Sequence, residues 1–76
     1  MGQNRTRDAL LARQLREARL SAGIRQVDVA QALKKPQSFV AKVEAGERRL
    51  TFNETLDFCH VIGLEPLQLV QLLRKG

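Results

Sequence analysis

The chain has 76 residues, 28% of them charged, a net charge of +5 and a single cysteine. A chain of this length forms one domain with a thin core, because it buries only about 60% of the surface that its unfolded form exposes. A lone cysteine excludes an internal disulfide, no apolar run reaches the roughly 18 residues of a membrane span, and the polar start MGQNRTRD does not resemble a signal peptide, so we expect a cytoplasmic protein without a membrane segment.

Helical spacing of apolar residues recurs along the chain, and no segment alternates apolar and polar residues with a period of two. The sequence therefore predicts an all-α fold of five helices. The first helix is expected from about Arg7 to Ala22, with Thr6 as its N-cap and Gly23 as the left-handed residue that ends it. Residues 1–8 are expected to form a flexible N-terminal arm, ahead of a domain at residues 9–73.

Two short helices are expected next, over residues 26–33 and 37–45, with only Lys34-Lys35-Pro36 between them. A connection of three residues is too short for anything but a tight turn. Pro36 disfavours helical geometry at the residue before it and fits the first turn of a helix, so it marks where the second of these helices begins. Two helices joined in this way, in a basic chain, are typical of a helix-turn-helix that reads DNA.

A fourth helix is predicted after Thr51-Phe52-Asn53-Glu54, which has the spacing of a capping box. In this motif the first and the fourth side chains satisfy each other's backbone donors. The helix is expected to end at Gly63 and to bury the apolar residues that recur with helical spacing, namely Phe52, Leu56, Cys59 and Ile62.

The last helix is expected from Pro66 to about Leu73, and it carries more apolar residues than one stripe uses. Leu67, Val70 and Leu73 are expected to face the core. Leu69 and Leu72 fall on another side, which we interpret as a homodimer interface built from the fourth and fifth helices. The alternative is local packing of these two leucines against the fourth helix.

The positive charge is concentrated in the first two-thirds of the chain. Residues 1–25 carry +4, residues 26–49 carry +2, and residues 50–76 carry −1. The positive electrostatic potential therefore lies over residues 1–49, which contain the helix-turn-helix and where a nucleic acid would lie. Charge alone leaves the partner open, because many small domains are basic without binding DNA.

With these elements in place, the chain resembles the phage Cro and repressor type of helix-turn-helix domain, also called the XRE family. The resemblance covers about Leu11 to Leu73 and rests on the segments LREARLSAGIRQ, VAQAL, PQSFVAKVEAGERRL and VIGLEP, in this order. It implies five helices, with the third lying in the major groove of double-stranded DNA. No cofactor is expected.

Carried over residue by residue, the resemblance makes Gln37, Ser38, Phe39 and Lys42 the base-reading residues. A glutamine amide donates and accepts hydrogen bonds at once and so can pair bidentately with adenine. Lys42, one turn after Ser38, is placed for a guanine edge or a phosphate. Phe39 stands where the family prefers a small or polar residue: its ring could contact a thymine methyl, or it could complete the core or a dimer surface.

Phosphate contacts are expected from the second helix, the turn and the loop after the third helix. Gln26 matches the family glutamine that binds a phosphate, and Glu47-Arg48-Arg49-Leu50 resembles the segment that grips phosphates beside the fourth helix, where the helix dipole favours an anion. Arg25 replaces the usual capping Ser or Thr. Lys34 replaces the turn glycine, so the turn requires either a left-handed lysine or a new shape. The expected phosphate-binding residues are Arg25, Gln26, Lys34, Lys35, Arg48 and Arg49.

Arg19 and Glu44 match a family pair in which the first helix reaches the end of the third through a partly buried salt bridge. Such a pair would set the orientation of the recognition helix. The alternative for these two residues is a pair of separate, exposed charges.

Three classes of function follow from these patterns. The first is a sequence-specific transcriptional regulator that acts as a dimer on a palindromic operator. The second is an antitoxin or another protein-interaction module that binds a partner and autoregulates. The third, an enzyme, is not expected, because Cys59 and the only histidine, His60, are adjacent on a helix and point about 100° apart. Cys59 is interpreted as a small buried residue and His60 as an exposed one, and no catalytic or metal-binding set is visible.

Overall fold

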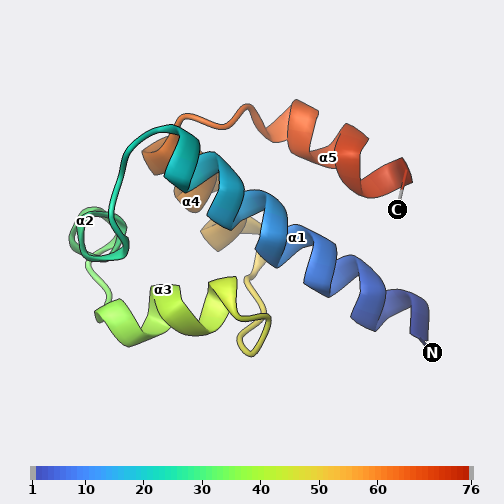
Figure 1. The fold of residues 1–76 in the computed structure, drawn as a ribbon, viewed down its shortest axis with the longest axis horizontal. Coiled ribbons are helices and arrows are strands. Elements are labelled where there is room, and N and C mark those ends of the chain that lie inside the picture. The colour runs from blue at the N-terminus through green and yellow to red at the C-terminus, as the bar shows by residue number, and fades with distance from the viewer. Residues whose placement is uncertain (1, 76) are drawn as a thin grey trace.

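The structure is a computed structural model that describes residues 2–75 and the side chains of residues 7–74. Within these residues it consists of five helices and no strand: α1 (Gly2–Ser21), α2 (Gln26–Leu33), α3 (Gln37–Glu44), α4 (Phe52–Ile62) and α5 (Pro66–Lys75). Helix α1 contacts α3, α4 and α5, and α2 contacts α3 and α4. In Figure 1, α3 and α5 lie on opposite sides of α1. The all-α fold predicted from the sequence is confirmed.

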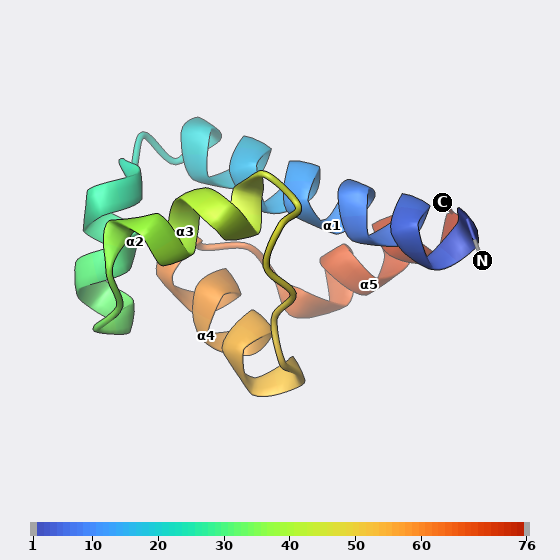
Figure 2. The ribbon, with the colours of Figure 1, turned by 90° about the horizontal axis from the view of Figure 1, so that it is seen from below.

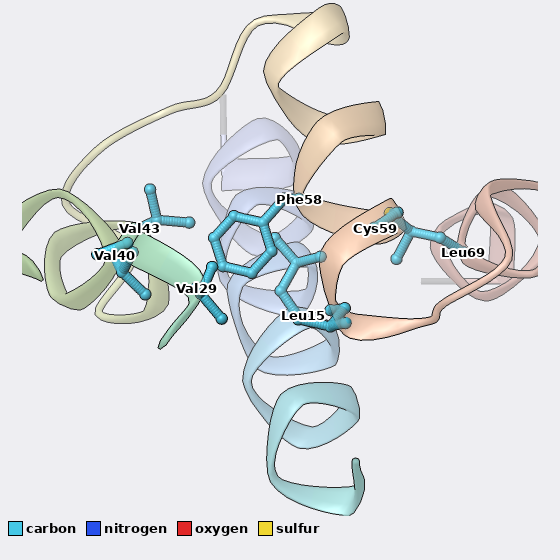
Figure 3. Close-up of a cluster of buried hydrophobic side chains, with 9 residues drawn as sticks. Leu15, Val29, Val40, Val43, Phe58, Cys59 and Leu69 are labelled. Atoms are coloured by element: carbon cyan, nitrogen blue, oxygen red, sulfur yellow. The ribbon is translucent and has the colours of Figure 1, made fainter. Parts of the chain in front are cut away.

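Buried side chains from all five helices form one core. Figure 3 shows Phe58 of α4 between Val29 of α2 and Leu15 of α1, with Cys59 and Leu69 on the side of α5. All but Leu69 of these five are fully buried, and Leu69 is 3% exposed. Burying a large apolar side chain of this kind stabilises a fold by about 1.5 to 3 kcal/mol, so the core depends on few residues. The other members of the cluster are Ala30, Val40, Val43 and Ile62.

Helix α4 buries only part of the stripe that the sequence predicted. The exposed fraction falls along this stripe from 75% at Phe52 through 37% at Leu56 to 0% at Cys59. The prediction that Phe52 and Leu56 are buried was therefore wrong, and Phe58 takes their place in the core. The reason is geometric: Cys59 lies beside Leu69 of α5, whereas the first turns of α4 extend past this contact.

Helix α5 faces the core with the side that carries Leu69, and not with the side that carries Leu67 and Val70. Leu69 is buried in the core cluster and Leu73 packs against it, while Leu67 and Val70 are 71% and 49% exposed. The prediction of Leu69 as a dimer-interface residue was therefore wrong, and so was the placing of Leu67 and Val70 in the core. Leu72 is half-buried, and its role in a dimer interface stays a prediction. Because two sides of this helix are apolar, its own sequence does not decide which side the rest of the fold covers.

The first helix begins earlier than predicted, at Gly2 rather than about Arg7. Residues 2–8 are thus helical instead of forming the predicted arm, and Thr6 is not an N-cap. The residue three places after Thr6 is Ala9, which cannot complete a capping box, and no glycine or proline interrupts the segment between Gly2 and Ser21. Met1 lies outside the described residues.

Among residues 2–75, no single helix is long and apolar enough to cross a membrane. Only α4 and α5 taken together reach that length and apolar content, and the chain bends by 115° between them.

Candidate nucleic-acid interface

The turn between α2 and α3 is closed by a left-handed lysine. Lys34 has φ 58° and ψ 44°, which is one of the two alternatives that the sequence left open. Its backbone N–H donates to the carbonyls of Ala30 and Gln31, and the N–H of Lys35 donates to the carbonyl of Ala30 at 2.9 Å. These bonds satisfy the last carbonyls of α2, which offsets the cost of a left-handed residue with a Cβ. The side chains of Lys34 and Lys35 remain exposed.

Arg25 occupies the N-cap of α2, where it is bound to Asp28. The Asp28 carboxylate accepts the Arg25 backbone N–H at 3.2 Å and the guanidinium at 3.0 and 3.1 Å. An arginine side chain has no acceptor, so only the carboxylate half of a capping box is present. The Arg25 guanidinium and backbone N–H hold the pKa of Asp28 below its usual range. Arg25 therefore has a partner within its own chain, although its side chain is 77% exposed.

Helix α3 presents its polar residues to solvent because its apolar residues are fixed in the core. Pro36 is the extended residue before the helix, and Val40 and Val43 are buried. With these two positions inward, Gln37, Ser38 and Lys42 are all exposed. Figure 2 shows α3 across α2, at the surface of the molecule. Three of the four predicted base-reading residues are thus accessible to a ligand, and Phe39 is half-buried.

The C-terminal end of α3 is tied to α1 by a buried ion pair. The Arg19 guanidinium donates to both carboxylate oxygens of Glu44, from Nε at 2.6 Å and from Nη2 at 3.0 Å. The two side chains are 8% and 3% exposed, so the alternative of two separate surface charges does not apply. Arg19 Nη1 also donates to the carbonyl of Ile24 at 2.8 Å, which fixes the start of α2 to the same point.

Gln26 completes this network in a way that the sequence did not predict. Its side-chain Nε2 donates to Glu44 Oε1 at 3.0 Å. Because a carboxylate only accepts hydrogen bonds, this contact determines which end of the amide faces Glu44. No buried side-chain nitrogen or oxygen in the described part of the chain lacks a hydrogen-bond partner. The network therefore joins α1, α2 and α3 through hydrogen bonds to one buried ion pair.

The loop after α3 leads into a capped helix. Thr51 Oγ1 accepts the Glu54 backbone N–H at 3.1 Å, and Glu54 Oε1 accepts the Thr51 N–H at 2.9 Å, as the capping box predicted. Arg48 pairs with Glu54 at 3.3 Å, and Arg49 pairs with Asp8 of α1 at 3.0 Å. The hydrogen bond from Thr51, with smaller contributions from Arg48 and Lys35, lowers the pKa of Glu54. Both arginines are exposed.

Phe39 brings together two of the predicted phosphate-binding residues. The Lys35 Nζ lies 5.3 Å from the centre of the Phe39 ring, and the Arg48 Cζ lies 5.0 Å from it. Both distances are within the range of cation–π attraction. Lys35 and Phe39 are four apart in the sequence, a spacing that could have indicated their contact, but nothing local relates either of them to Arg48.

Cys59 and His60 do not form a reactive pair. Cys59 is fully buried, and this burial raises the pKa of its thiol, which keeps it protonated. His60 is exposed. Within the described residues, no group of three or more His, Cys, Asp or Glu side chains is placed to hold a metal ion.

Comparisons with known proteins agree with this architecture. A family model described as a helix-turn-helix domain matches residues 10–73. An XRE-family-like protein from Pseudomonas syringae pv. tomato str. DC3000 has 46% sequence identity and a TM-score of 0.85, with 92% of this chain and 85% of that chain covered. The restriction-modification controller protein C.Esp1396I has 17% identity and a TM-score of 0.80, with 91% of each chain covered. None of the curated proteins compared matches.

Proposed function

We propose a function for this chain, which belongs to the XRE-type helix-turn-helix family. It is a sequence-specific DNA-binding transcriptional regulator that acts as a homodimer on a palindromic operator. The observation that carries the proposal is the surface of α3, where Gln37, Ser38 and Lys42 are exposed. The buried pair of Arg19 and Glu44 holds this surface in one orientation. A rigid helix with exposed polar side chains suits the major groove, whose base pairs present distinct patterns of donors and acceptors.

The basic side chains around α3 support this proposal. Lys34 and Lys35 lie in the turn before the helix, and Arg48 and Arg49 lie in the loop after it, all of them exposed. A helix that enters a groove has a phosphate backbone on each side, so cations at both ends of α3 would position the helix without reading sequence. The loop also precedes the N-terminus of α4, where the helix dipole favours an anion.

The proposed dimer uses the apolar residues that α4 and α5 leave exposed: Phe52, Leu56, Leu67 and Val70. We call them the α4–α5 apolar face. Leu56 lines a surface hollow that runs from α4 to the start of α5, and the polar side chains of His60 and Glu65 line it together with Leu64 and Pro66. Residues 50–76 carry only −1, so two copies could meet here without the repulsion that the basic half would cause. A second copy of the chain is therefore the expected occupant.

The test of sequence reading compares two surface variants. We expect Gln37→Ala to remove the preference for one sequence and to leave weak binding, because a bidentate base contact contributes about 1 to 3 kcal/mol of discrimination. Arg49→Ala should weaken binding to all sequences alike and reduce the slope of log K against log salt by about one. The measurement is fluorescence anisotropy on a duplex selected from a random library and on a scrambled duplex, at several salt concentrations.

Equal losses on both duplexes for both variants would contradict the assignment of roles. If the selection enriches no sequence and a second protein co-purifies in fixed proportion, the antitoxin or interaction-module function would be favoured instead. An enriched palindrome would report sequence preference, dimer symmetry and half-site spacing together.

A further inference from the structure

Four side chains from separate segments meet beside the N-terminal end of α3, and we call them the Phe39 cluster: Lys35, Phe39, Arg48 and Glu54. Lys35 comes from the turn, Phe39 from α3, Arg48 from the loop and Glu54 from the first turn of α4. The ring lies within 5.3 Å of the Lys35 cation and 5.0 Å of the Arg48 cation, and Arg48 also pairs with Glu54. The cluster thus connects the segments before and after the proposed recognition helix.

We propose that Phe39 is a positioning residue for phosphate binding, whose ring holds Lys35 and Arg48 in place as a preformed pair of cations for the DNA backbone. This inference rests on the proposed DNA-binding function. It assigns Phe39 to affinity for DNA of any sequence, and leaves the reading of bases to its exposed neighbours Gln37 and Ser38.

The geometry separates Phe39 from its two neighbours on α3. Gln37 and Ser38 are exposed, whereas Phe39 is half-buried and packs against the core cluster. Part of the Phe39 ring packs against the core, and two cations lie over the ring. Little of its surface therefore remains for contact with a thymine methyl. The core contact also fixes the ring, so the ring can fix the cations.

Holding these cations in place matters because lysine and arginine have long side chains with many rotamers. Ordering such side chains at the moment of binding reduces affinity, and order that already exists in the free protein avoids this cost. The Phe39 ring attracts each cation through its face. Glu54 holds Arg48 from the other direction, with Nη1 at 3.4 Å and Nη2 at 3.3 Å from its carboxylate oxygens. Arg48 also donates to the carbonyl of Arg49, and because an arginine has five N–H donors, donors remain for a phosphate oxygen.

The net charge of the Phe39 cluster also suits an anion. Lys35 and Arg48 contribute two positive charges and Glu54 one negative charge, and the N-terminus of α4 adds its partial positive charge nearby. The Glu54 carboxylate accepts a hydrogen bond from the backbone N–H of Thr51. This bond lowers the pKa of Glu54 and keeps its carboxylate at the N-cap of α4. The Phe39 cluster therefore has a net positive charge, which can attract the phosphates of one stretch of DNA backbone.

The test replaces the ring by an apolar side chain that has no π face. We expect Phe39→Leu to weaken binding about five- to tenfold on the selected duplex and by the same factor on a scrambled duplex, since the loss concerns the ordering of two side chains. Phe39→Tyr keeps the aromatic face and should bind within about twofold of the unchanged protein. Circular dichroism and melting of each variant establish a temperature at which all are folded, and binding is compared there.

A double-mutant cycle shows whether Phe39 acts through the two cations. In the background Lys35→Ala/Arg48→Ala, we expect Phe39→Leu to cause little further loss, because the groups that the ring positions are gone. Three results would overturn the inference: full affinity in Phe39→Leu, a loss that is equally large in both backgrounds, or a changed base preference at one operator position. Failure of the unchanged protein to prefer any DNA sequence would instead refute the proposed function.

Discussion

We expect Glu44→Ala to lower the free energy of unfolding by about 3 to 5 kcal/mol, because it leaves the charge of Arg19 buried and without its partner. Arg19 and Glu44 are 8% and 3% exposed and share two hydrogen bonds. For a domain of 60 to 100 residues, each kcal/mol shifts the melting temperature by about 4 to 8 °C. Thermal and urea unfolding followed by circular dichroism measure the change.

The chain offers a matched control on the surface of α1. Arg13 and Glu17 also form an ion pair, at 3.1 Å, but their side chains are 73% and 53% exposed. Because an exposed pair contributes only about 0 to 1 kcal/mol, Glu17→Ala should change stability little. A loss in Glu44→Ala no greater than that in Glu17→Ala would show that the buried pair does not stabilise the fold.

The double variant Arg19→Met/Glu44→Leu separates two contributions to the free energy of unfolding: the penalty of an unpaired buried charge and the net stabilisation by the ion pair. With both charges removed, we expect a smaller loss of stability than in Glu44→Ala alone, because no buried charge remains. DNA binding should still suffer, because the end of α3 is then no longer anchored to α1 and Gln26 loses its acceptor.

The start of α3 and both ends of α4 were predictable from the sequence because local signals fix them. Pro36 begins α3, the capping pair of Thr51 and Glu54 begins α4, and Gly63 ends α4 in a left-handed conformation. Each of these effects acts within four or five residues, so it needs no knowledge of the rest of the fold. The contact between Arg19 and Glu44, which are 25 residues apart, came instead from the family resemblance.

Contacts between distant segments were harder to predict. Both α4 and α5 carry more apolar side chains than the core receives, and only the packed structure shows that Leu69 is buried and Leu67 is not. The partner of Arg49 was missed for a similar reason, since Asp8 lies on α1 and only the packing of α1 against the loop after α3 brings the two side chains together. Phe39 was left between two interpretations because its neighbours come from three segments.

The α4–α5 apolar face leads to the second large expected effect. We expect Leu67→Asp to convert the proposed dimer into a monomer, because each copy would then bury a charged side chain in the interface. Leu67 is 71% exposed, so the substitution should leave the core of each protomer intact. Size-exclusion chromatography with light scattering at high micromolar concentration measures the oligomeric state.

Loss of the dimer should also change DNA binding, because the second half-site is held by the same complex as the first. Linked binding of two modules raises affinity by about 10² to 10⁴, and Leu67→Asp should lose a factor of this size on a full palindrome and little on a half-site. Gln68→Asp is the matched control: it places the same charge on α5, at an exposed position about 100° around the helix from Leu67. If Gln68→Asp disrupts the dimer as strongly as Leu67→Asp, added charge on α5 would explain the result without this face. If the unchanged protein is a monomer at high micromolar concentration, the proposed dimer is wrong.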